Sequence, residues 1–276
     1  EITDAKATIT KSDADTNAAV SYLSDVNDGT GDVYSVGNSA YKVENAKVAI
    51  AADGATDISN RLIGVELVTT GTGTITARHA YNDYAPIDAA SGDIILKGLA
   101  AEATTDKYVD TVANLSIGEN RTLSVYSNWN GPLTEATVKV TGTAKFAAGA
   151  KMNGNLVLSS GAAVTMAEAL TMGSTVTLGE GMTLAGDLVS TIQRLGEGET
   201  TNLFTGVDEL YLGDSTVASG NLTEADAVTL GTYFTGFDET YYLGYDGQNV
   251  YAGVKSPVTP AVPEPTTATL SLLALA

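Results

Sequence analysis

The chain is poor in the residues that most often build catalytic and metal centres. Its 276 residues include no cysteine, one tryptophan (Trp129) and one histidine (His79). Without cysteine there can be no disulfide and no thiolate metal ligand. A single histidine, placed beside Arg78 near the end of an expected strand, does not assemble a multi-histidine metal site or a Ser-His-Asp triad. We interpret His79 as an ordinary strand-end residue.

Basic residues are also scarce. There are 14 Lys and Arg against 33 Asp and Glu, which gives a formal net charge of −19 and a pI near 4.1. Such a charge repels phosphate backbones and anionic lipid headgroups. We therefore expect no nucleic-acid partner, and we expect the acidic surface mainly to keep the chain soluble.

The residues that are abundant favour short strands joined by tight turns. There are 29 glycines and 13 tyrosines but only four phenylalanines, and Thr, Val and Ala are frequent. β-Branched and aromatic residues favour strands, whereas glycine adopts the positive φ that sharp turns need. This composition predicts an all-β protein.

A degenerate repeat indicates how the strands are arranged. Each unit has an apolar-x-apolar step, a turn at Asn or Gly and a second such step, with starts at residues 115, 138, 156 and 176. The four units are Leu115-x-Ile117 with Leu123-x-Val125, Val138-x-Val140 with Ala144-x-Phe146, Leu156-x-Leu158 with Val164-x-Met166, and Val176-x-Leu178 with Met182-x-Leu184. Their turns fall at Asn120, Gly142, Gly161 and Gly181. A period near twenty predicts a right-handed parallel β-helix, or β-solenoid, of irregular coils; the alternative is an antiparallel β-sandwich.

The N-terminal part repeats the pattern more faintly. Residues 4–10 and 45–51 share a spacing 41 residues apart, which we interpret as two coils. We expect residues 62–68 to form one strand. Residues 81–92, which include Pro86, are expected to form a loop that interrupts the stack.

The pattern changes at Asp187. Leu188, Ile192 and Leu195 form an i, i+4, i+7 stripe that predicts a short helix ending at Gly196. Strands are expected at residues 200–207, 209–212, 240–243 and 249–254. The predicted organisation is therefore a β-solenoid over 1–186, a β-rich capping module over 187–254 and a linker over 255–262 that contains Pro257 and Pro260.

The chain ends in a Pro-Glu-Pro triplet, Pro263, Glu264 and Pro265, followed from Ala268 by an uncharged run of Leu and Ala. This segment resembles the PEP-CTERM sorting signal of Gram-negative bacterial surface proteins, with the motif and half of the hydrophobic helix present and the Arg-rich tail absent. The resemblance implies processing by an exosortase-type membrane protease and a transient stay in the inner membrane. It also implies an exported protein at the cell surface, the outer membrane or in the extracellular matrix. We expect residues 263–276 to be a truncated signal and the N-terminus to be trimmed as well.

A second resemblance concerns residues 202–251. Asn202-Leu203-Phe204-Thr205-Gly206-Val207-Asp208 and the sequence up to Tyr251 are similar to the C-terminal module of autotransporter-like surface proteins that carry this signal. Those proteins have β-helical passengers. The resemblance therefore implies a β-helical body for this chain too.

Candidates for chemistry are few. Asp13, Asp15 and Asn17, like the set Asp25, Asp28 and Asp32, could hold calcium weakly, but they lack the remaining EF-hand ligands and are interpreted as solvated turns. A polysaccharide lyase or glycosidase on a β-helix is the alternative function, and it needs carboxylates close together. Glu119 and Glu180 occupy what the repeat makes equivalent turns, three coils or about 15 Å apart. We therefore predict no catalytic residue, cofactor or metal.

The remaining expectation is a structural or adhesive role. A solenoid presents long faces of hydroxyl, amide and aromatic side chains, which suit extracellular polysaccharide or host glycans as partners. The tyrosines that are candidates by type for stacking on sugars are Tyr22, Tyr34, Tyr41, Tyr81, Tyr84 and Tyr126.

Overall fold

The computed structural model describes short strands between residues 8 and 69, and then residues 72–81, 87–97, 109–127, 134–217, 222–224 and 228–256. Side chains are described for 72–74, 76, 87–97, 111–127, 134–217, 222–224 and 228–256. These residues form mostly β-strands, and the part described holds two short helices, α1 (Asp187–Ile192) and α2 (Leu230–Tyr233). The prediction of an all-β protein is confirmed.

The strands belong to two large sheets and one small one. The first sheet has the order β1 (Thr8–Ile9), β5 (Lys47–Ile50), β7 (Glu66–Thr69), β9 (Ile87–Ala89), β11 (Val109–Ile117), β13 (Thr137–Phe146), β15 (Asn155–Leu158), β18 (Val176–Leu178), β21 (Leu210–Leu212) and β22 (Ser215–Val217). From β13 it branches to β16 (Ala163–Met166), β19 (Met182–Ala185) and β24 (Phe234–Thr235).

The second sheet runs through β6 (Ala55–Ile63), β8 (Thr74–Tyr81), β10 (Asp93–Lys97), β12 (Thr122–Tyr126), β14 (Lys151–Asn153), β17 (Leu170–Met172), β20 (Thr200–Thr205), β26 (Asn249–Val254), β25 (Tyr241–Tyr245) and β23 (Val228–Thr229). A small antiparallel sheet joins β2 (Ser24–Asn27), β3 (Asp32–Val36) and β4 (Ser39–Tyr41).

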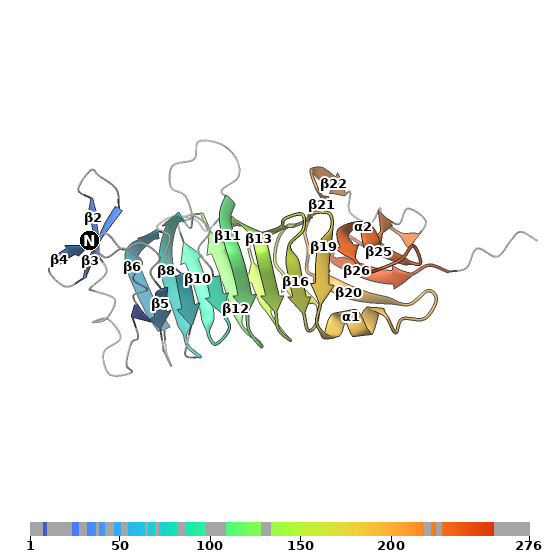
Figure 1. The fold of residues 1–276 in the computed structure, drawn as a ribbon, viewed down its shortest axis with the longest axis horizontal. Coiled ribbons are helices and arrows are strands. Elements are labelled where there is room, and N and C mark those ends of the chain that lie inside the picture. Colours follow the sequence, from blue (N-terminus) through green and yellow to red (C-terminus); the bar gives the residue numbers. More distant parts are fainter. Residues whose placement is uncertain are drawn as a thin grey trace, which may run out of the picture.

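Three parallel ladders make up the middle of the molecule. Ladder A contains the first half of β13 with β15, β18 and β21. Ladder B contains β9, the second halves of β11 and β13, β16, β19 and β24. Ladder C contains β8, β10, β12, β14, β17 and β20. The chain visits them in turn, since β15, β16 and β17 lie in ladders A, B and C and β18 returns to A. We call these ladders the parallel stack (Figure 1). Such parallel pairing is not what the antiparallel β-sandwich alternative predicts.

The core of the stack is made by every second residue of its strands. In β15, Leu156 and Leu158 are fully buried, and Leu156 pairs with Val138 on one side and Val176 on the other. Columns of this kind from all three ladders join one continuous hydrophobic cluster. Because side chains alternate across a strand, the intervening residues point outward.

The ladders show that the predicted repeat was misaligned. Leu115 pairs with Ala144 and not with Val138, so Leu115-x-Ile117 is the second step of its unit. Leu123 belongs to ladder C, where it pairs with Ile94 and Met152. The predicted unit therefore lacked its third strand, which is represented by β14 and β17. In addition, the turn predicted at Gly142 is a bulge inside β13, where Gly142 passes close to the carbonyl of Ala113.

Three N-terminal predictions are wrong. Thr8 pairs directly with Lys47, so β1 and β5 are adjacent strands and not two coils apart. Residues 62–68 contain the end of β6 and the start of β7, which lie in different sheets. Within the expected loop 81–92, strand β9 pairs in parallel with β7 and β11, which continues ladder B instead of interrupting it.

The C-terminal predictions agree better with the structure. Helix α1 begins at Asp187 and buries Leu188 and Ile192, although it ends at Ile192 and not at Gly196. The four expected strands correspond to β20, β21, β25 and β26. Strand β20 pairs in parallel with β17 and antiparallel with β26, so strand direction changes there. We call β23, β25 and β26 with α2 the C-terminal antiparallel unit; it adjoins β20, the last strand of ladder C, at one end of the stack (Figure 1).

Candidate functional site

Most residues predicted as site candidates lie outside the described residues or in strands whose side chains are not described. Pro263, Glu264 and Pro265 lie outside the described residues, as do Asp13, Asp15, Asn17, Asp28, Tyr22 and Tyr84. The backbone places Asp25 in β2, and Asp32 and Tyr34 in β3, while Tyr41 lies in β4 and both His79 and Tyr81 in β8. Of the candidate tyrosines only Tyr126, half-buried at the end of β12, has a described side chain. The backbone register pairs Tyr34 with Asp25 on one side and with Tyr41 on the other, in strands whose side chains are not described.

The predicted equivalence of Glu119 and Glu180 is wrong. Glu119 lies in the turn from β11 in ladder B to β12 in ladder C, next to Asn120 with φ 54°. Glu180 lies in the turn from β18 in ladder A to β19 in ladder B, where its backbone N–H donates to Ser160 Oγ at 3.2 Å. The two carboxylates therefore belong to different corners of the stack.

The outer face of ladder A carries a polar recess. Two columns of outward side chains cross β13, β15, β18 and β21, and the turn between β21 and β22 flanks them. The first column is Thr137, Asn155, Thr175 and Glu209, and the second is Lys139, Val157, Thr177 and Tyr211. Together with Gly213 and Asp214 they line a groove of about 450 Å³, which we call the β21 groove.

Hydrogen bonds fix the first column. The Asn155 side-chain Nδ2 donates to Thr137 Oγ1 at 3.3 Å, and Asn155 Oδ1 accepts from the Thr175 backbone N–H at 3.3 Å and from Ser174 Oγ. Thr137 and Ser174 are buried, so these bonds satisfy polar groups that water does not reach. The floor of the groove is therefore rigid.

Tyr211 sets the far end of the second column. It is half-buried, and its hydroxyl donates to Glu209 Oε2 at 3.1 Å, which ties the ring to the neighbouring outward residue of its own strand. Glu209 and Asp214 are both exposed. At the opposite end, Lys139 makes no ion pair with any residue that the structure describes. The groove thus has a carboxylate-rich end beside an aromatic ring and an ammonium group at the other end.

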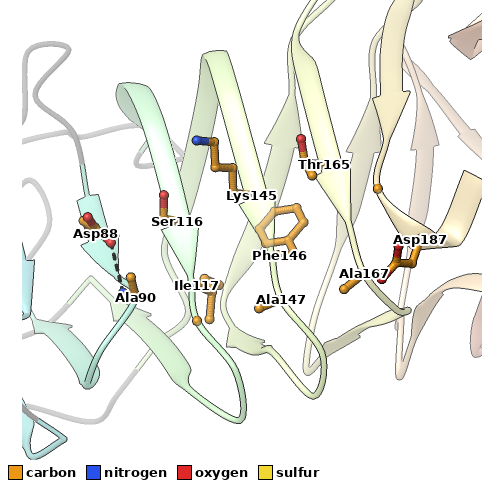
Figure 2. A pocket seen from close by; sticks show the side chains of 12 residues that line it. Asp88, Ala90, Ser116, Ile117, Lys145, Phe146, Ala147, Thr165, Ala167 and Asp187 are labelled. Atoms are coloured by element: carbon orange, nitrogen blue, oxygen red, sulfur yellow. Dashed lines mark hydrogen bonds between the residues drawn. The ribbon is translucent and has the colours of Figure 1, made fainter.

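A second recess lies on the outer face of ladder B (Figure 2). Asp88, Ser116, Lys145 and Thr165 occupy successive strands there, and Asp187 at the start of α1 closes the end. Below this row the wall is apolar, with Ala90, Ile117, Ala147 and Ala167 among its lining residues. We call this recess of about 560 Å³ the α1 groove. The register places Ser116 directly beside Lys145.

Side-chain titration is perturbed mainly in the C-terminal antiparallel unit. Burial raises the pKa of Tyr233, Tyr242, Tyr245 and Tyr251, and nearby carboxylates add to the effect. The Tyr245 hydroxyl donates to the carbonyls of Val207 and Asp208 at 3.1 and 3.0 Å. These tyrosines pack within the unit, and none of them lines either groove.

The described residues offer little for metal or covalent chemistry. No group of three or more His, Asp or Glu side chains suited to a metal ion occurs among them. In the same part of the chain, no helix is long and apolar enough to cross a membrane. What the β21 groove can do is donate and accept hydrogen bonds and pack an apolar ring face against Tyr211.

This groove was not predicted from the sequence, although every strand beneath it was. Tyr211 and Glu209 lie beside Thr177 and Thr175 only because β21 pairs with β18 across two intervening strands, β19 and β20, and helix α1. A fixed period of twenty does not reach them. Comparison of the chain with protein-family models, with curated proteins and with solved structures gives no match.

Proposed function

We propose that this chain is an exported, surface-associated protein with a structural or adhesive role, built on a right-handed parallel β-helix. The observation that carries the proposal is the set of three parallel ladders that the chain visits in turn, with inward apolar columns and outward polar ones. A body of this kind holds flat polar faces in a rigid array. It is suited to spanning a distance at the surface or to presenting a face to a matrix.

The destination is proposed from the C-terminal sequence. The Pro263-Glu264-Pro265 triplet and the apolar run after it support export through a PEP-CTERM type signal, processed by an exosortase-type protease. The proposed parts are a passenger over 1–186, a capping module over 187–254, a linker over 255–262 and the signal over 263–276. The change of strand direction at β20 supports a cap near the proposed boundary.

The sorting part is tested in cells that carry the matching protease. The protein is expressed from its native gene, and its exposure at the cell surface is measured by protease accessibility on intact cells. Replacing the triplet, by Pro263→Ala, Glu264→Ala and Pro265→Ala together, is expected to abolish surface display because the motif is the recognition element. The linker variant Pro257→Ala with Pro260→Ala is the matched control. Surface display that survives loss of the triplet would contradict the proposal.

The β-helical body has its own test. Small-angle X-ray scattering on residues 1–256 is expected to give the pair-distance distribution of a rod, with one short and one long dimension, because stacked strands extend along a single axis. A distribution typical of a sphere would contradict the β-helix. Incubation of the same protein with neutral and acidic polysaccharides is expected to release no shortened products; depolymerisation would favour the alternative, a polysaccharide-active enzyme.

A further inference from the structure

We propose that the β21 groove binds a neutral, hydroxyl-rich saccharide, with a sugar ring against Tyr211 and hydroxyl groups bonded to Thr175, Thr177 and Glu209. This inference deepens the adhesive function proposed above and rests on it. It names the site and the chemical class of the ligand.

The dimensions of the groove suit an extended ligand. Lys139, Val157, Thr177 and Tyr211 are register partners on four successive strands. Neighbouring strands lie about 4.8 Å apart, so the column is roughly 14 Å long. The β21–β22 turn, where Gly213 has a φ of 60°, reverses the chain and leaves Asp214 at the rim. The groove therefore runs across the strands, which fits a short stretch of a polysaccharide better than a compact metabolite.

The lining groups match the hydrogen-bonding character of sugars. A sugar hydroxyl both donates and accepts, and the groove offers the same variety: threonine hydroxyls do both, the Lys139 ammonium only donates and the Glu209 and Asp214 carboxylates only accept. The apolar face of a pyranose also needs an apolar partner. Tyr211 and Val157 are the outward side chains of the groove that provide one.

Charge selects against acidic ligands. The groove has one ammonium group against two carboxylates, and the whole chain has a net charge of −19. An acidic polysaccharide would approach a surface of like charge, which lowers both its encounter rate and its affinity. A neutral saccharide avoids this repulsion and keeps every hydrogen bond.

The groove is organised before any ligand arrives. Asn155 is held by Thr137, Ser174 and the Thr175 backbone, and the Tyr211 hydroxyl is held by Glu209. Preformed geometry reduces the conformational entropy that binding would otherwise cost. In the α1 groove the wall below the polar row is apolar, and nothing in the structure indicates what covers it.

The test is a glycan array followed by titration calorimetry with the protein over residues 1–276. The neutral probes are cello-, xylo- and chitin oligosaccharides, and the acidic probes are alginate and polygalacturonate oligosaccharides. We expect saturable binding to at least one neutral series and a weaker response to the acidic ones. Tyr211→Ala is expected to weaken that binding about tenfold, which is the loss of roughly 1.4 kcal/mol of ring contact. Tyr211→Phe, which keeps the ring, is expected to change it less than about threefold.

Two further variants keep the result interpretable. Thr177→Val preserves the shape of β18 but removes a hydroxyl, so it is expected to weaken binding even if Tyr211→Ala misfolds. Thr165→Ala, an outward residue of ladder B in the α1 groove, is the matched control and is expected to have no effect. The inference is overturned by an absence of neutral-sugar binding, by a preference for acidic probes, or by binding that neither Tyr211→Ala nor Thr177→Val weakens. Each of these results leaves the surface-display test untouched, so failure of the groove is distinguishable from failure of the proposed function.

Discussion

Gly118 in the parallel stack and Gly244 and Gly253 in the C-terminal antiparallel unit have different close neighbours. In the stack, a Cβ added to Gly118 would lie 1.9 Å from the carbonyl oxygen of Ala90, which belongs to the preceding layer. In the antiparallel unit, a Cβ on Gly244 or Gly253 would instead meet a tyrosine ring, at 2.3 Å from Tyr251 or 2.5 Å from Tyr242. One set of glycines lets two backbones approach; the other makes room for a side chain.

The tyrosine–glycine pairs follow directly from the register of β25 and β26. Tyr242 is paired with Gly253 and Gly244 with Tyr251, so each ring lies over the glycine of the opposite strand. The two rings also contact one another edge to face, with centroids 6.2 Å apart and planes at 83°. Such pairs bury glycine backbone and stabilise a sheet through side chains. Gly118 therefore allows a close backbone approach between layers of the stack, whereas Gly244 and Gly253 accommodate aromatic side chains.

The largest expected effect comes from adding one methyl group to Gly118 in the stack, and Gly253 in the antiparallel unit is its comparison. Gly118→Ala should lower the free energy of unfolding by about 3 kcal/mol, because a carbonyl of the preceding layer must move. Gly253→Ala should lower it by less than about 1 kcal/mol, because the end of the Tyr242 ring can shift. Urea unfolding followed by circular dichroism measures both. If the two variants lose equal amounts of unfolding free energy, the expected difference between Gly118 and Gly253 is contradicted.

A smaller effect should come from removing one buried hydroxyl from the antiparallel unit. Tyr245→Phe removes the hydroxyl donor from the buried carbonyl of Val207 and from the partly buried carbonyl of Asp208, and should cost about 1 to 2 kcal/mol. Tyr211→Phe removes the same group from an outward residue whose acceptor, Glu209, remains in water, and should cost little. Thermal unfolding of the two variants compares them. The account of Tyr245 is contradicted if both variants unfold together with the wild type.

Alkaline pH should affect the antiparallel unit before the stack. Burial raises the pKa of Tyr233, Tyr242, Tyr245 and Tyr251, so the folded state favours the neutral phenol. The stability that this adds is fully present below pH 10, the ordinary tyrosine value, and is lost as the pH rises through the higher folded pKa values. All four residues lie in this unit.

Limited proteolysis with mass spectrometry can locate the change. Between pH 8 and pH 11, cleavage should rise in β25 and β26 while β15 and β18 stay protected, and phenolate absorbance should show late-titrating tyrosines. Tyr245→Phe should reduce the increase in cleavage of β25 and β26 between pH 8 and pH 11. Cleavage that begins in the stack would contradict the assignment.

The sequence predicted the parts of the fold whose signal is local. Alternation in β15 and β18, turn glycines at 161 and 181 with φ of 75° and 68°, and the apolar stripe of α1 all depend on neighbouring residues, and all are present. Strand β14 gave no such signal, because it has three residues and buries only Met152. A single buried methionine does not establish a period. The three-ladder arrangement therefore could not be derived from alternation alone.

The groove was beyond prediction for a related reason. Its members come from β13, β15, β18 and β21, and their adjacency is a property of register between strands, not of any one segment. The segment between β18 and β21 contains α1 and β20, and its length hides the pairing of Thr177 with Tyr211. The sequence contains Tyr211, but it does not indicate which residues of other strands lie beside it.

The register of the ladders is the same although the number of residues between partners in adjacent layers varies widely. Hydrogen-bonded partners in adjacent layers are 18 residues apart for Asn155 and Thr137, 20 for Thr175 and Asn155, 29 for Asn153 and Ser124, and 34 for Thr205 and Thr171. The extra residues leave the ladder at its corners and return to the same column. Segments can therefore be inserted or deleted at the corners without disturbing the core. In homologous sequences, we expect differences in length at the corners and unchanged apolar residues in the inward columns.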